Sequence, residues 1–152
     1  MLRFSVPVLL AALAVSCQSS TELPFSNGHI FTEATQNDFG DALTYPSGKA
    51  AFTNDIKVWK PEFVSPWYFH PFYGTATILQ GTLTIEYDRE TPADDSGGTK
   101  TVTDTKVYTA GDSFMSVVDT WHQSSNRGSE PFVFIVSWMG EEGQPLTYLH
   151  ED

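Results

Sequence analysis

The stretch TLTIEY, residues 82–87, alternates strictly between polar and apolar side chains. Because successive side chains of a β-strand point to opposite faces, the pattern predicts a half-buried strand with Leu83, Ile85 and Tyr87 on one face. A second stretch, FVFIVSW at residues 132–138, is apolar on both faces and predicts a central strand between two packed layers. No long window outside the N-terminal apolar segment shows helical periodicity. The sequence therefore predicts an all-β domain, either a sandwich or a small barrel.

The amino-acid composition excludes some classes of binding partner. The 152 residues include 8 Lys and Arg against 19 Asp and Glu, a formal net charge of -11, and a chain of this length suits one domain. So few cations cannot build the basic patch that nucleic acid or anionic lipid requires, and we expect no nucleic acid partner. With 40% hydrophobic and 18% charged residues, the chain has enough apolar material for a core, which excludes disorder throughout.

The N-terminus has the pattern of an export signal. Residues 1–16 carry Arg3 and an apolar run too short for a permanent membrane span, followed by small residues before Cys17. The sequence LAVSC at residues 13–17 resembles a bacterial lipobox, which implies lipidation of Cys17; ordinary signal cleavage is the alternative. We therefore expect an exported protein, either a lipoprotein of the cell envelope or a secreted or periplasmic protein. A lipid anchor would be its one membrane contact, and a single cysteine allows no internal disulfide.

Two segments resemble the paired motifs of the cupin family. The first runs from Pro66 to Gly81 and the second from Gly111 to Asn126, in the family's order and with its internal spacing. The resemblance, to single-domain bacterial cupins of the cupin 2 conserved-barrel type, covers about residues 43–138. Within the all-β class it implies a double-stranded β-helix, also called a jelly-roll barrel.

This resemblance also implies a division of the chain. We expect a signal peptide over residues 1–16 and, over 17–42, a tether with peripheral N-terminal strands. The cupin barrel is expected over residues 43–140, and a mostly solvated C-terminal tail over 141–152.

The resemblance further implies a reduced metal site. Cupins hold a metal ion with two histidines separated by one residue, a glutamate and a later histidine. His70 and His122 match two of these positions, but Tyr68 takes the place of the first histidine and Gly74 that of the glutamate. Metal ions such as zinc usually take three or more protein ligands. The implied cofactor is therefore one weakly held Zn, Fe, Mn or Ni ion on His70, His122 and Tyr68. The alternative is that the two histidines are hydrogen-bonded pocket residues without a metal ion.

Aromatic side chains crowd both motifs. Core packing accounts for many of them, and the alternative is a ring-lined pocket for a small apolar or aromatic molecule. The residues expected in this ligand pocket are Tyr68, His70, Phe72, Asp119, Trp121 and His122. His122 with Asp119 would also suit a general base, although the sequence assigns no catalytic residue.

Three functions remain open from the sequence. The first is an exported or lipid-anchored single-domain cupin that binds a small molecule in the barrel mouth. The second is a metal-dependent enzyme of the dioxygenase, isomerase or lyase type that uses His70, His122 and Tyr68. The third is a non-catalytic interaction module of the cell envelope, with a homodimer as the expected assembly. Nucleophile motifs, phosphate loops and dinucleotide fingerprints are absent from the sequence.

Overall fold

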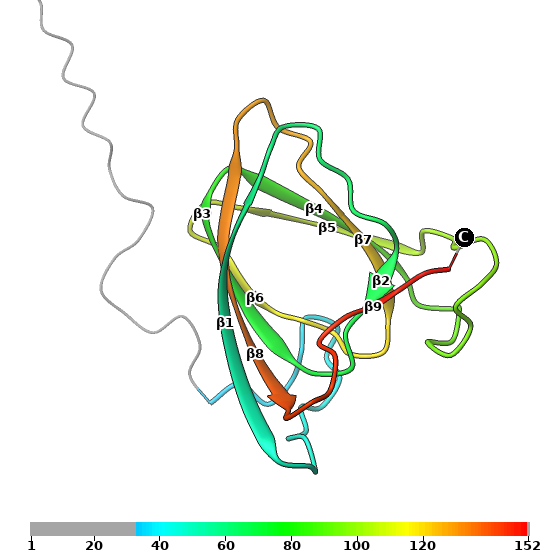
Figure 1. Cartoon of the computed structure of the whole chain (residues 1–152). Helices are drawn as coiled ribbons and strands as arrows, with labels where there is room; N and C mark the ends of the chain where they lie inside the picture. The colour runs from blue at the N-terminus through cyan, green and yellow to red at the C-terminus, as the bar shows by residue number, and fades with distance from the viewer. Residues whose placement is uncertain (1–32, 152) are drawn as a thin grey trace, which may run out of the picture.

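The computed structural model describes residues 33–151, which consist of β-strands and loops (Figure 1). The strands are β1 (Ala50–Trp59), β2 (Tyr68–Phe69), β3 (Gly74–Gln80), β4 (Thr82–Asp88), β5 (Asp104–Thr109), β6 (Ser113–Met115), β7 (Trp121–Ser125), β8 (Phe132–Glu141) and β9 (Tyr148–Leu149). No helix in this part of the chain has the length and apolar character needed to cross a membrane. The signal peptide at 1–16 and the lipidation site at Cys17 lie outside the described residues.

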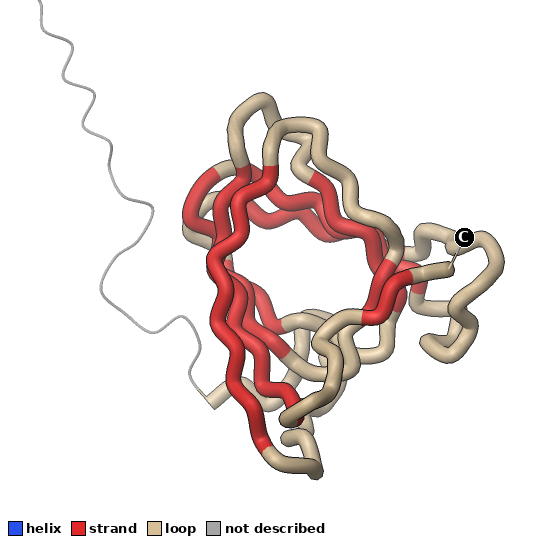
Figure 2. The backbone as a smooth tube through the Cα atoms, in the orientation of Figure 1, coloured by secondary structure: helices blue, strands red, loops and turns tan. Residues whose placement is uncertain are grey.

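The strands form two antiparallel sheets that face each other (Figure 2). One sheet has the order β1-β8-β3-β6 and the other β5-β4-β7-β2-β9. For the first eight strands, this interleaving of the chain between two four-stranded sheets is the arrangement of an eight-stranded jelly roll. The prediction of an all-β, double-stranded β-helix barrel is therefore confirmed.

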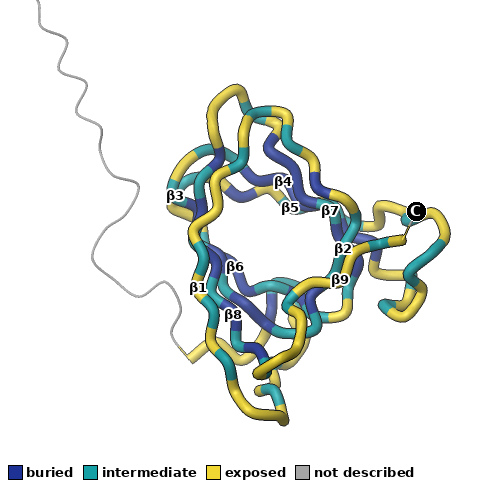
Figure 3. The backbone as a smooth tube through the Cα atoms, viewed as in Figure 1, coloured by how far each residue is buried: buried dark blue, intermediate teal, exposed yellow. Residues whose placement is uncertain are grey.

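The alternation in β4 is confirmed, since Leu83, Ile85 and Tyr87 are all buried in the core. Buried residues are concentrated in β4 and β7 and alternate along β8 (Figure 3). As expected, β8 is an interior strand, between β1 and β3. The prediction that both of its faces are buried was wrong, because the residues between its inward-facing ones are only half-buried. On the neighbouring β1, the same outer face leaves Phe52 71% exposed and Ile56 66% exposed.

Positive backbone angles occur at three turn positions of the motifs. Gly81, between β3 and β4, has φ 81°, and Gly111, between β5 and β6, has φ 97°. Asp119, before β7, also adopts a positive φ of 47°. Asp tolerates this left-handed conformation better than most side chains, so the turn before β7 forms without a glycine.

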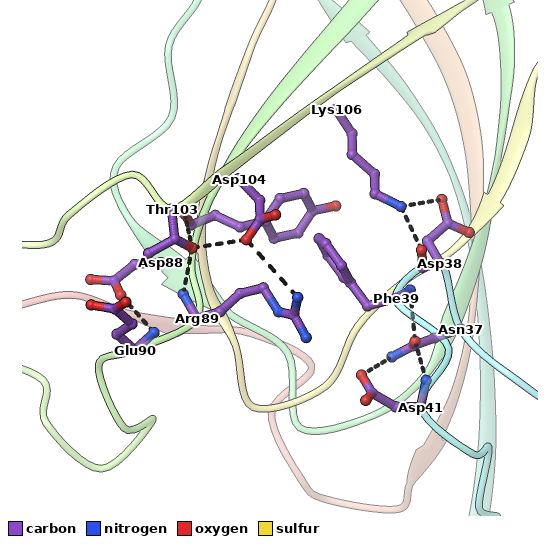
Figure 4. Close-up of polar contacts among 11 residues, drawn as sticks. Asn37, Asp38, Phe39, Asp41, Asp88, Arg89, Glu90, Thr103, Asp104 and Lys106 are labelled. Carbon is purple, nitrogen blue, oxygen red and sulfur yellow. Dashed lines mark hydrogen bonds and ion pairs between the residues drawn. The ribbon is translucent and has the colours of Figure 1, made fainter.

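Residues 37–42, here called the N-terminal clasp, pack against the barrel, and Figure 4 shows Asp38 beside Lys106 of β5. The carboxylate of Asp38 accepts hydrogen bonds from the Tyr108 hydroxyl at 2.5 Å and the Met115 amide at 3.2 Å. The ring of Phe39 lies between two cations, 4.2 Å from the Arg89 guanidinium carbon and 4.4 Å from Nζ of Lys106. One bridge pair, Gln36 with Ala42, is found in the described part of the segment where peripheral strands were expected.

Most residues of the C-terminal segment are exposed, but the segment also contains a short strand that the sequence did not predict. Tyr148 and Leu149 form β9, which extends the second sheet beside β2. The ring of Tyr148 stacks on Phe69 with centroids 5.0 Å apart, and the His150 amide donates to the Trp67 carbonyl at 2.9 Å. In the sequence, this segment has few apolar residues among its acidic ones, so it carries no pattern that predicts a strand.

Candidate ligand-binding cavity

A cavity of about 620 Å³ lies between the two sheets. Its apolar lining residues are Trp59, Pro66, Ala76, Leu83, Ile85, Tyr87, Phe114, Val117, Phe134, Val136, Trp138, Leu146 and Leu149. Its polar lining residues are Asp55, Lys57, Ser65, Tyr68, His70, Ser116, His122, Ser124 and Thr147. This volume, with a largely apolar wall and a few polar groups, is typical of sites for small molecules.

Three residues of the sequence prediction meet on one wall of this cavity. Strand β2 pairs with β7 so that Tyr68 lies opposite His122, and His70 follows two residues after Tyr68 and therefore shares its face. The ring centroids of His70 and His122 are 5.2 Å apart. The ring of Tyr68 lies 4.2 Å from that of His122 and 5.1 Å from that of His70.

Backbone carbonyls fix the tautomer of both histidines. Nδ1 of His70 lies 2.7 Å from the carbonyl oxygen of Leu146, and Nδ1 of His122 lies 2.8 Å from that of Thr120. Because a carbonyl oxygen can only accept, each Nδ1 must carry the hydrogen and donate it. Each Nε2 therefore carries the lone pair of a neutral imidazole.

Burial keeps both imidazoles neutral. Removal from water lowers the pKa of His70 to about 3, with a further contribution from the charge of His122 and an opposing one from the bond to Leu146. Burial likewise lowers the pKa of His122 to about 4, against the opposing effect of its bond to Thr120. Near neutral pH, this wall therefore presents two hydrogen-bond acceptors and no positive charge.

Tyr68 is a phenol rather than a phenolate. Burial raises the pKa of its hydroxyl to about 12, and the hydrogen bond to Ser124 opposes this rise only in part. The two hydroxyl oxygens are 2.7 Å apart. Tyr68 is therefore poorly suited to the role of an anionic metal ligand.

Trp138 occupies the space beside the position of the missing carboxylate. A Cβ added at Gly74 would lie 2.4 Å from Cε3 of Trp138 and 2.8 Å from the carbonyl oxygen of Ser137, so no side chain fits there without movement. The same indole packs on His70, with ring centroids 4.1 Å apart. An aromatic ring thus fills the region next to the imidazoles.

The donor set does not fit a metal ion that takes three or more protein ligands. Within residues 33–151, no group of three or more His, Cys, Asp or Glu side chains lies close enough to hold one. The wall offers two imidazoles, a protonated phenol and an indole ring, and an indole has no lone pair to donate.

The remaining predicted pocket residues lie elsewhere. Phe72 and Asp119 line a separate pocket of about 260 Å³, and the Asp119 amide donates to the His70 carbonyl at 2.9 Å. Burial raises the pKa of Asp119, but its carboxylate is not part of the lining that contains His122. The structure therefore does not bring these two residues together as an acid–base pair.

Trp121 also lies outside the cavity, on the face of β7 opposite to that of its neighbour His122. Its indole N–H donates to the Pro92 carbonyl at 2.9 Å, and Nζ of Lys100 lies 4.5 Å from its ring. It therefore packs beneath the loop at 89–103. The alternation of side chains along a strand already predicts that Trp121 and His122 point to opposite faces of β7.

Several cavity residues were not singled out as pocket residues from the sequence. Trp138 is the last residue of the apolar stretch at 132–138, and the alternation along β8 places it on the same face as Phe134 and Val136. Ser124 lies two residues after His122 in β7 and shares its face. Leu146 and Thr147 belong to the C-terminal segment, in which no sequence pattern predicts strand pairing.

The charged lining residues are both on β1. Asp55 and Lys57 are inward-facing but half-exposed, with side chains 39% and 47% accessible, and they form an ion pair at 3.1 Å. They therefore form a polar rim, while the deeper wall carries no formal charge near neutral pH.

No protein-family model matches the chain, and no curated protein matches it. Solved structures do match it. A formate complex of oxalate decarboxylase from Lactobacillus farciminis is 16% identical, with a TM-score of 0.50, over 64% of this chain and 26% of its own. A protein with a double-stranded β-helix domain from Klebsiella pneumoniae is 16% identical, with a TM-score of 0.49, over 72% of this chain and 91% of its own.

A cupin 2 conserved-barrel protein from Salinispora arenicola is 19% identical, with a TM-score of 0.46, over 64% of this chain and 71% of its own. The strand order above is that of a jelly roll, which cupins share. The chain has the cupin fold. It spans only 26% to 44% of the oxalate decarboxylase and of two DMSP lyase structures that it also matches. At these identities the likeness shows the fold alone, and the cupin fold by itself assigns no reaction.

Proposed function

We propose that the barrel cavity binds a small, neutral, largely apolar molecule and does so without a metal ion. The observation that carries this proposal is the cavity of about 620 Å³, walled by aromatic and aliphatic side chains, with two neutral imidazoles on one side. Apolar surface supplies most of the binding free energy in such sites, and a few polar groups orient the ligand.

The charges around the cavity favour a neutral ligand. Among the lining residues that belong to 33–151, Lys57 is the only Lys or Arg, and it is already paired with Asp55 at the rim. A carboxylate inside the cavity would lose its hydration without gaining a cation, which is strongly unfavourable. The overall formal charge of -11 opposes an anionic ligand further.

The test uses 4-propylanisole, a neutral aromatic ether, with 4-propylbenzoate as the matched anion. We expect the ether to bind in titration calorimetry and to raise the thermal midpoint, and the benzoate to bind at least about tenfold more weakly. Absence of binding of any neutral aromatic probe would overturn the proposal.

A pair of variants tests whether the cavity is the binding site. Ala76→Phe places a ring in the cavity, whereas Thr75→Phe places the same ring on the opposite face of β3. We expect the first variant to lose binding of 4-propylanisole and the second to retain it. Equal binding by both folded variants would place the probe elsewhere.

A metal-dependent enzyme is the second candidate, and one observation favours it. Histidines that ligate metals usually donate their other ring N–H to a carbonyl or carboxylate, as both histidines do here. Because only these two imidazoles on this wall can donate to a metal ion, we expect no stoichiometric metal. Elemental analysis of protein purified without nickel affinity distinguishes the two candidates, and one equivalent of a transition metal would favour the enzyme.

We further propose that the protein is exported, with cleavage before Cys17. The support is the pattern of residues 1–16 and the lipobox-like residues 13–17. Intact-mass analysis of the mature protein tests the cleavage, and retention of Met1 would contradict it. Membrane association that is unchanged in Cys17→Ser would contradict lipidation.

A further inference from the structure

We infer that the ligand of this cavity carries a hydroxyl or N–H donor, which the Nε2 atoms of His70 and His122 accept. This inference rests on the proposed function, because it specifies the chemistry of the molecule that fills the same cavity. Its basis is the arrangement of hydrogen bonds around the two rings.

In the rings of His70 and His122, one nitrogen has a hydrogen-bond partner in the described part of the protein and the other has none. Each Nδ1 is held by a backbone carbonyl, at 2.7 Å for His70 and 2.8 Å for His122. Among residues 33–151, no group donates a hydrogen bond to either Nε2. Yet the rings belong to residues that are only 8% and 5% exposed. Two lone pairs are therefore held deep in the fold without a protein partner.

The two Nε2 atoms face the cavity. In the described part of the chain, every side-chain nitrogen or oxygen that is fully shielded from solvent has a hydrogen-bond partner. Since neither Nε2 has one, both must be reachable from open space, and the open space that both residues line is the cavity. A bound molecule would shield these atoms and must then replace the hydrogen bonds that solvent provides.

Three hydroxyls that line the cavity with the imidazoles already take part in hydrogen bonds within the protein. The hydroxyls of Tyr68 and Ser124 bond to each other at 2.7 Å, and Oγ of Ser116 accepts the Gly74 amide at 2.7 Å. These hydroxyls can each turn to donate or to accept, whereas each Nε2 can only accept, so a donor on the ligand is the one group that satisfies the imidazoles. A ligand without one would leave two shielded acceptors unpaired, whereas a ligand with a hydroxyl would satisfy at least one of them.

The pKa values of the two histidines also indicate that each Nε2 accepts a hydrogen bond and does not donate one. Burial lowers the pKa of both rings far below neutral pH, so each Nε2 remains an acceptor and does not become a donor. The wall should therefore discriminate between a phenol and its methyl ether, which have nearly the same apolar surface.

Titration calorimetry with 4-propylphenol and 4-propylanisole at neutral pH tests the inference. We expect the phenol to bind about tenfold more tightly than the ether, the scale of one net hydrogen bond in a buried site. If the ether binds as tightly as the phenol, the inference is overturned while the proposed function stands. If neither probe binds, both fail.

Matched variants assign the effect to the imidazoles. Asn in place of histidine keeps a donor near Nδ1 but has no atom at Nε2, whereas Gln places an amide oxygen near Nε2. We therefore expect His122→Asn together with His70→Asn to abolish the preference for the phenol, and the corresponding Gln variants to retain part of it.

The control is His150→Asn, because the His150 ring lies beside Trp121, on the face of β7 turned away from the cavity. This variant should keep the full preference. Circular dichroism confirms that each variant is folded, and each histidine is also tested singly in case the double variant is unstable. A preference that survives in the folded Asn variants would overturn the inference.

Discussion

At the scale of single residues, Gly74 and Trp138 help to explain why the donor set of this cavity does not fit a metal ion that takes three or more protein ligands. The motif positions of His70 and His122 are compatible with metal binding. The indole takes the space into which a side chain at Gly74 would extend, and it packs on the His70 ring. The absence of a side chain at position 74 and the position of the indole are therefore structurally coupled.

This coupling predicts the outcome of substitutions at both positions. Gly74→Ala should destabilise the fold by about 1–3 kcal/mol, because its Cβ would overlap Trp138 at 2.4 Å. Denaturant unfolding of Gly74→Ala, Trp138→Leu and the double variant measures the coupling between them. We expect the double variant to be more stable than the sum of the single effects. Strict additivity would contradict the proposed overlap.

The same reasoning changes what is needed to rebuild a metal site. Tyr68→His with Gly74→Glu restores the residue types of the family but leaves the glutamate in collision with Trp138. We expect zinc affinity in titration calorimetry to rise by orders of magnitude only when Trp138→Ala is added, because the indole then leaves the space beside His70 and the backbone at Gly74 has only to shift from the Ser137 carbonyl oxygen. Tight zinc binding by the double variant without the Trp138 change would show that the indole moves easily.

At the scale of secondary structure elements, strongly patterned segments were predictable from the sequence. The alternation in 82–87 gives β4 and its buried face, and the apolar run at 132–138 gives an interior strand. The motif spacing is compatible with the shared wall of His70 and His122, because β2 and β7 pair in register. These features depend on local periodicity or on the order of strands in the fold.

Very short strands, and the burial of strand faces that depends on long-range packing, could not be predicted from the sequence. Strand β9 has only two residues, and its pairing with β2 depends on contacts far apart in the chain. Trp121 was expected in the pocket because aromatic residues crowd both motifs. It adjoins His122 on β7, however, and adjacent side chains on a strand point to opposite faces. The outer face of β8 was expected to be covered because it is apolar, but burial there depends on whether another layer exists.

Strand β9 also gives a prediction at this scale. Tyr148→Ala removes the ring stacked on Phe69 at 5.0 Å, and we expect faster hydrogen exchange in residues 146–150 because few contacts hold this segment. Affinity for 4-propylphenol should fall as well, since Leu146 and Leu149 line the cavity. Tyr45→Ala is the control, because Tyr45 is 85% exposed. Unchanged exchange in Tyr148→Ala would show that β9 is held by other contacts.

At the scale of the whole molecule, the buried histidines link stability to pH. Their pKa values in the folded protein, about 3 for His70 and about 4 for His122, lie below the ordinary value of 6.5. The unfolded chain therefore binds protons first as the pH falls. Below about pH 6.5, the free energy of unfolding should decrease by up to about 1.4 kcal/mol per pH unit for each histidine, and above it these groups have no effect.

Urea unfolding of the wild type and of His122→Asn, from about pH 8 to about pH 5, measures this linkage. The variant lacks one of the two groups, so its stability should fall less steeply between about pH 6.5 and pH 5. An equal slope in both proteins would mean that His122 takes up a proton in the folded state as readily as in the unfolded chain.

The central claim concerns the neutral imidazoles of His70 and His122, which are protonated at Nδ1. Their Nε2 atoms carry no hydrogen, have no hydrogen-bond partner among the residues that the structure describes, and accept a hydrogen bond from a ligand in the barrel. Long-range ¹H–¹⁵N NMR of protein labelled at its histidine nitrogens observes these atoms directly. At neutral pH, we predict Nδ1–H and unprotonated Nε2 for His70 and His122. Addition of 4-propylphenol should shift the Nε2 resonance of at least one of them and leave those of His150 in place. Protonated Nε2 atoms, or Nε2 resonances of both residues that do not move when the ligand is saturating, would contradict the claim.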